Sequence, residues 1–245
     1  MWAQPAILSS CNLSAASARE AATKIAPLVF TLNPFKPTNS ARRILCLGAH
    51  SDDIEIGCGG TVLRWLEEHP ELEVSWVVLS SNRERKKEAL KGAGLFLQGA
   101  RKSKVLVESF RDGFFPYDGT AIKEYIEALK KRFSPDIVLT HYRDDRHQDH
   151  RMVSDLTWNT FRRELVLEYE IPKYDGDFGQ PNLFVPLSEF VCRKKIQCIL
   201  DVFRTQRTKD WLTEDTLQAV LRLRGVECHA PEKWAEAFYC RKMIL

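Results

Sequence analysis

The stretch ILCLGAHSDDIEIGCGGT at residues 44–61 decides the fold. Its first four residues form a continuous apolar run, which is typical of a strand buried on both faces of a parallel sheet. A polar segment that contains His50, Asp52 and Asp53 follows at once, and a helix is expected over residues 60–68. The stretch therefore predicts a strand, a loop rich in metal-ligand side chains and then a helix.

The same alternation continues downstream. Further strands are expected at residues 72–79, 104–107 and 136–140, and further helices at 83–97, 121–133 and 151–163. The last third is less regular, with short strands expected at 165–168 and 184–185 and helices at 188–205 and 214–224. Strand–helix alternation at this spacing implies right-handed crossovers. The predicted fold class is α/β, with a Rossmann-like, mainly parallel sheet that carries helices on both faces.

Composition excludes several classes of protein. The chain has 245 residues, 44% of them hydrophobic, and a net charge of only +3, which argues against a disordered chain. No stretch of about 18 uncharged apolar residues is present, so no membrane span is predicted. The basic residues form no concentrated run beyond short helical segments, so no nucleic-acid partner is expected. Seven cysteines without a CxxC pair favour a reducing cytoplasm, and no signal peptide is predicted at the N-terminus.

Residues 1–43 differ from the rest of the chain. They hold a Ser/Ala-rich helical stretch near 14–30 and a proline-bearing linker at 33–37, so they are interpreted as an N-terminal arm. Residues 44–245 then form the main domain. The arm and the irregular last third are candidate contact surfaces for a homo-oligomer.

A second polar stretch, HYRDDRHQDH at residues 141–150, follows the expected fourth strand. Four of the six histidines lie in this stretch or in the loop after the first strand. Because ligands of open parallel sheets bind at the carboxyl ends of the strands, the pattern predicts a metal site at that edge.

Spacing supports a catalytic metal. His50 and Asp53 are three residues apart and can share one ion, which leaves Asp52 free to act as a base. His147 and His150 have the same spacing. Two imidazoles and one carboxylate, with a position open for water, form a recurring zinc arrangement that favours metal-assisted hydrolysis.

Glycines 57, 59 and 60 invite comparison with a dinucleotide-binding loop, but the GxGxxG order is absent and nearby carboxylates would repel a pyrophosphate. They are expected instead to let the backbone turn tightly beneath the metal loop.

Residues 49–61 resemble the first motif of the LmbE-like or PIG-L deacetylases, and residues 147–150 resemble their second motif. With weaker similarity at 167–172 and 235–238, the resemblance covers most of residues 44–245. It implies a zinc-dependent hydrolase that removes an acetyl group from a small N-acetylated amino sugar conjugate of the N-acetylglucosamine type. The motifs usually have proline where this chain has Ser51 and Gln148, which puts the rigidity of both loops in question.

The resemblance also implies a role for each matched residue. The implied zinc ligands are His50, Asp53 and His150. Asp52 would be the general base, His147 would stabilise the oxyanion or protonate the leaving amine, and Asp149 would orient an imidazole.

Arg85 and Asp112 are candidates for contacting the substrate. Arg85 could instead form a surface pair with Glu88, and Asp112 could simply set a turn with Gly113. His141, at the end of the fourth strand, could take the role of His147 or be structural. The other two histidines, His69 and His229, are expected to be unrelated to the site. An aromatic cluster is expected to form either a wall for a sugar ring or local core: Phe114, Phe115 and Tyr117.

Two other functions stay open. The first is a metal-dependent amidase or phosphoesterase that acts on a different bond, and the second is a non-catalytic metal-binding protein.

Overall fold

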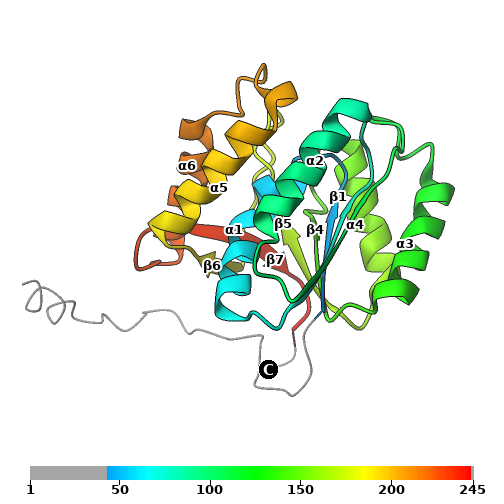
Figure 1. The fold of residues 1–245 in the computed structure, drawn as a ribbon, viewed down its shortest axis with the longest axis horizontal. Helices are drawn as coiled ribbons and strands as arrows, with labels where there is room; N and C mark the ends of the chain where they lie inside the picture. Colours follow the sequence, from blue (N-terminus) through cyan, green and yellow to red (C-terminus); the bar gives the residue numbers. More distant parts are fainter. Residues whose placement is uncertain (1–42, 244–245) are drawn as a thin grey trace, which may run out of the picture.

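The computed structural model describes residues 43–243. A seven-stranded sheet with the order β3-β2-β1-β4-β5-β7-β6 forms its centre (Figure 1). Its strands are β1 (Arg43–Gly48), β2 (Glu73–Val78), β3 (Lys102–Val107), β4 (Ile137–His141), β5 (Leu165–Tyr169), β6 (Leu183–Pro186) and β7 (Ala235–Cys240). The α-helices are α1 (Asp53–Glu68), α2 (Arg83–Phe96), α3 (Gly119–Phe133), α4 (Gln148–Thr160), α5 (Glu189–Val202) and α6 (Glu214–Glu227), and a short 3-10 helix spans Arg204–Gln206.

The sheet is parallel from β3 to β5, as the strand–helix alternation predicts. Strand β7 then runs antiparallel between β5 and β6. The sequence analysis did not predict β7 as a strand, since its second residue is Glu236, a carboxylate that lies buried in the structure. Its ion-pair partner, Lys195, is far away in the sequence.

Helices cover both faces of the sheet, which confirms the predicted class (Figure 1). Strand β1 shows why, since its side chains alternate between two cores. Ile44 and Cys46 join the hydrophobic cluster that contains the helices α1, α2, α5 and α6. Leu45 and Leu47 join the cluster that contains α3 and α4. Because β1 is buried from both sides, the strand ends in a loop whose position is fixed by two cores.

Helix α1 corrects one expectation. It begins at Asp53, not near residue 60, and continues through the glycine cluster. The glycines serve close packing and not a turn. A Cβ at position 57 would lie 2.1 Å from Cδ2 of Tyr169, and one at position 59 would lie 2.5 Å from Cε1 of Phe96.

The predicted N-terminal arm lies outside the described residues, apart from Arg43, which begins β1. Among residues 43–243, no helix combines the length and the apolar character that a membrane crossing requires.

Candidate metal centre

The histidine and aspartate residues singled out in the sequence meet at the carboxyl ends of β1 and β4. His50 and Asp52 lie in the short turn between β1 and α1, and Asp53 is the first residue of α1. His147 is the N-cap of α4, so His150 lies in the first turn of that helix. The topology places β1 beside β4, and two segments that are 100 residues apart therefore face each other.

Three side chains have polar atoms at the spacing of a metal site. Nδ1 of His50 lies 3.2 Å from Nε2 of His150. Asp53 faces the two imidazoles with different oxygens: Oδ2 lies 3.5 Å from His50, and Oδ1 lies 3.6 Å from His150. A tetrahedral zinc with bonds of about 2.0–2.1 Å separates neighbouring ligand atoms by about 3.3 Å. The three side chains, all buried, therefore fit one small divalent cation.

Other combinations of nearby ligand atoms overlap with this one. Three sets have ligand atoms within 4.8 Å of one another: His50, His147 and His150; His50, Asp112, His147 and Asp149; and Asp53, His141 and His150. His50 and His150 occur together in the first set, and Asp53 and His150 in the third. None of the three sets holds all three ligands that the sequence analysis assigned to the ion.

Each metal-facing imidazole is held from behind by a carboxylate. Nε2 of His50 lies 3.1 Å from Oδ2 of Asp149. Nδ1 of His150 lies 2.9 Å from Oδ2 of Asp145. Such a bond fixes the ring orientation and tautomer, and it raises the basicity of the ligating nitrogen. The sequence analysis assigned this role to Asp149 but missed Asp145.

The two orienting carboxylates are themselves anchored. Asp149 accepts hydrogen bonds from the backbone N–H of Gly113 at 2.7 Å and of Phe115 at 3.1 Å. Asp145 forms an ion pair with Lys173 at 2.9 Å. The run of polar residues at 141–150 gives no hint of Lys173, which comes from the loop after β5.

Electrostatics at the centre favour a bound cation. Although burial opposes it, the carboxylates of Asp53, Asp112 and Asp149 raise the pKa of His50 well above its usual value. Burial and the neighbouring His141 lower the pKa of His150 to about 3, which keeps this imidazole neutral. A neutral imidazole is the form that binds a metal ion.

His147 lies beside the centre. Its Nδ1 accepts the backbone N–H of Asp149 at 3.2 Å and so caps α4. This bond leaves the proton of the neutral ring on Nε2. Burial and the nearby His50 lower the pKa of His147, so its neutral form is favoured. The ring centre lies 4.9 Å from that of His50.

Asp52 and Asp112 are joined by Arg85. Nη2 of Arg85 lies 2.8 Å from Oδ1 of Asp52, and Nη1 lies 3.5 Å from Oδ2 of Asp112. Asp112 also reaches His50, with Oδ1 at 3.1 Å from Nε2, although its side chain is 58% exposed. Burial raises the pKa of Asp52, and Arg85 partly opposes that shift.

The alternative of a surface pair between Arg85 and Glu88 is wrong. Glu88 accepts hydrogen bonds from the N–H and hydroxyl of Thr205, at 3.0 and 2.6 Å. Asn82 caps α2 by accepting from the backbone N–H of Arg85, which places that side chain in the first turn, beside Asp52.

The remaining candidates divide between core and surface. Phe115 is fully buried, whereas Phe114 and Tyr117 are 37% and 83% exposed, so the three rings form no common wall. His141 is fully buried. Its Nε2 accepts the N–H of Ala49, which is a structural contact, and the same atom lies 3.2 Å from Oδ2 of Asp53. His69 ends α1, about 24 Å along the helix axis from Asp53.

Residues 45–161 match the family PIG-L, described as GlcNAc-PI de-N-acetylase. Over this segment the chain is similar to the PIG-L family. The PIG-L match contains the residues assigned to the metal and to the reaction, whereas Lys173 and everything after it lie outside the match.

Several solved structures share this fold over most of their length. The N,N'-diacetylchitobiose deacetylase of Pyrococcus horikoshii is 22% identical, with a TM-score of 0.63 over 81% of this chain and 83% of that one. The A40926 pseudoaglycone deacetylase Dbv21 is 18% identical, with a TM-score of 0.64 over 82% and 97%. The 4-carboxy-2-hydroxymuconate hydratase of Pseudomonas putida is 17% identical, with a TM-score of 0.65 over 83% and 98%. Because a hydratase matches as well as the deacetylases do, this similarity establishes the fold and not the reaction.

Proposed function

We propose that this protein is a zinc-dependent N-deacetylase that removes the acetyl group from a small N-acetylated amino sugar conjugate. One observation carries the proposal: the ligand atoms of His50, Asp53 and His150 lie 3.2 to 3.6 Å apart, with a carboxylate behind each imidazole. The PIG-L match and the deacetylases of the same fold support the choice of an amide bond.

His50, Asp53 and His150 would hold the metal. A zinc ion bound there supplies a Lewis acid that polarises the amide carbonyl and lowers the pKa of a water molecule to about 7. The ion would displace the proton of His50 on binding. Two neutral imidazoles and one carboxylate would then leave a net positive charge on the ion, which strengthens both effects.

Asp52 is the proton acceptor in this proposal. Arg85 binds Oδ1, so we assign Oδ2 as the oxygen that removes the proton from the attacking water. Burial raises the pKa of Asp52, which makes this carboxylate a stronger base than an exposed aspartate. The same proton can then be passed to the amide nitrogen as the carbon–nitrogen bond breaks and acetate leaves.

His147 would act as a neutral donor. Its Nε2–H is available because Nδ1 is occupied as the cap of α4. Donation to the developing oxyanion contributes a few kcal/mol, by analogy with other oxyanion donors. Arg85 and the exposed Asp112 frame the approach to the metal and would bind the polar groups of the sugar.

The test is metal analysis of the purified protein followed by a screen for acetate release from N-acetylglucosamine-containing compounds. Acetate release with stoichiometric zinc is the expected result. Release of phosphate from a phosphorylated compound would favour the phosphoesterase alternative. A four-coordinate zinc that has no bound water, together with no turnover, would favour the non-catalytic alternative.

A further inference from the structure

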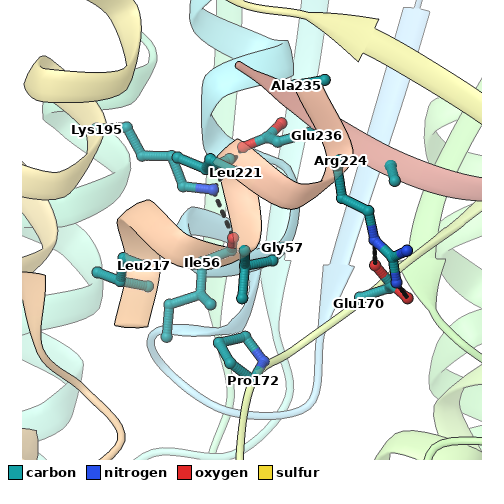
Figure 2. Close-up of a pocket in the computed structure, with 12 residues that line it drawn as sticks. Ile56, Gly57, Glu170, Pro172, Lys195, Leu217, Leu221, Arg224, Ala235 and Glu236 are labelled. Carbon is teal, nitrogen blue, oxygen red and sulfur yellow. Dashed lines mark hydrogen bonds and ion pairs between the residues drawn. The ribbon is translucent and has the colours of Figure 1, made fainter. Parts of the chain in front are cut away.

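A buried ion pair reaches the backbone in the middle of α1. Lys195 of α5 and Glu236 of β7 are each only 2% exposed, and their charged atoms lie 2.5 Å apart. Nζ of Lys195 donates to the carbonyl oxygen of Ile56 at 2.6 Å. Glu236 accepts the backbone N–H of Gly60 at 2.8 Å and of Thr61 at 2.6 Å. Figure 2 shows the Lys195 ammonium directed at α1 beside Ile56 and Gly57.

The ion pair contacts the backbone acceptor and the backbone donor of a single helical hydrogen bond. The carbonyl of Ile56 and the N–H of Gly60 are four residues apart, which is the spacing of a single α-helical hydrogen bond. A carboxylate on N–H groups and an ammonium on a carbonyl are the charges that stabilise helix N- and C-termini. The ion pair therefore acts as an internal cap between residues 53–56 and the remainder of α1.

The sequence of α1 explains the need for such a cap. Glycines at positions 57, 59 and 60 give the middle of this helix a low intrinsic helical propensity. Close packing excludes a larger residue, since a Cβ at position 60 would lie 2.5 Å from Leu187 and 2.9 Å from Glu236. The absence of a side chain at these glycines lets the Glu236 carboxylate approach the helix backbone. The ion pair then stabilises the helix at the point where the glycines weaken it.

The capped turn is the one that carries the catalytic aspartates. Ile56 donates its N–H to the carbonyl of Asp52 at 3.0 Å. The residue whose carbonyl accepts from Lys195 is therefore hydrogen-bonded to the backbone of the assigned base. Asp53 lies between them. A shift of this turn would move the assigned base and a metal ligand together.

We propose that Lys195 and Glu236 are positioning residues for the metal centre, which hold the first turn of α1 so that Asp52 and Asp53 face His50 and His150. In naming a metal, this inference rests on the proposed function. Both residues lie outside residues 45–161, so the last third of the chain would complete a centre whose assigned ligands all come from the segment that matches PIG-L.

The test compares two neutralised ion pairs in the full chain. The variant Lys195→Met/Glu236→Gln removes the pair on α1. The control Arg224→Met/Glu170→Gln removes another buried pair that lines the same small cavity, with contacts of 2.8 and 2.9 Å (Figure 2). The described hydrogen bonds of that pair go to Tyr239, Gly179 and Glu227, and none goes to α1.

Two measurements are made on each protein: the affinity for Zn²⁺, by competition with a chelating dye, and amide hydrogen exchange over residues 53–61. We expect the first variant to bind Zn²⁺ about tenfold more weakly. Its amides in this segment should exchange about tenfold faster. The control should stay within twofold of the wild type in both measurements, although both variants lose stability.

An affinity and an exchange rate within twofold of the wild type in the first variant, or equal losses in the control, would overturn the positioning role. If the double variant does not fold, Glu236→Gln alone is measured in the same way, with the same direction of change expected. A wild-type protein that binds no Zn²⁺ would instead refute the proposed function, and amide exchange would then decide whether the ion pair holds the turn.

Discussion

Replacing Asp145 by alanine should weaken metal binding without touching a metal ligand. Oδ2 of Asp145 lies 2.9 Å from Nδ1 of His150, and the side chain is only 2% exposed, so water cannot easily replace the lost acceptor. Loss of such an orienting partner typically lowers metal affinity about 10- to 100-fold. Because the site is buried, we expect a loss in the upper half of that range, about 30- to 100-fold, or about 2–3 kcal/mol.

The assay is competition for Zn²⁺ against a chelating dye at constant pH. Asp144→Asn is the matched control, since it removes one negative charge from the same loop, at a side chain that is 68% exposed. It should change the affinity less than twofold. An unchanged affinity in Asp145→Ala would refute the reasoning, and it would mean that His150 is oriented by its packing against other rings.

Three further outcomes follow from the same geometry. Asp52→Asn should lower the rate of acetate release by about 10²- to 10⁴-fold while the zinc content stays at the wild-type level; substantial residual turnover would show that the base is misassigned. Arg85→Met should move the acidic limb of the pH profile of kcat to higher pH, because Asp52 acts as a base only when ionised and Arg85 lowers its pKa. An acidic limb that stays in place, or moves to lower pH, would contradict this. Gly57→Ala should lower the free energy of unfolding by about 1–3 kcal/mol in urea denaturation, because the new methyl group would meet the ring of Tyr169 at 2.1 Å. Gly94→Ala, in a helix and with nothing within 4 Å, should instead raise it by about 0.5–1 kcal/mol, and equal effects at both positions would exclude the packing explanation.

Much of the fold could be predicted from local pattern. The apolar run in β1 and the strand–helix alternation to residue 163 specify a parallel sheet, because buried parallel strands and amphipathic helices have different periods. Strand β7 could not be predicted in this way. Glu236, its second residue, is tolerated in the interior because Lys195 lies opposite it, and no local pattern reveals a partner 41 residues away.

The start of α1 shows a different limit. Three glycines between positions 57 and 60 predict a turn, since each lowers the helical propensity of the segment. The structure has a helix there because tertiary contacts with Tyr169, Phe96 and the Lys195–Glu236 pair outweigh that propensity. Propensity acts within a few residues, whereas packing is decided by the whole sheet.

The sequence by itself indicated most of the His and Asp side chains that meet at the candidate metal centre, although not Asp145. The strand–helix alternation puts the carboxyl ends of the parallel strands at one edge of the sheet, and the His and Asp spacing within each loop is local. That β1 and β4 are neighbours was decided by the topology. Only the tertiary structure decided what orients them: Asp145 and Lys173 behind His150, Arg85 on Asp52, and the ion pair at the middle of α1. Orientation depends on distances of about 3 Å between segments that are far apart in the chain, and such distances exist only once the sheet and its two helical layers have packed.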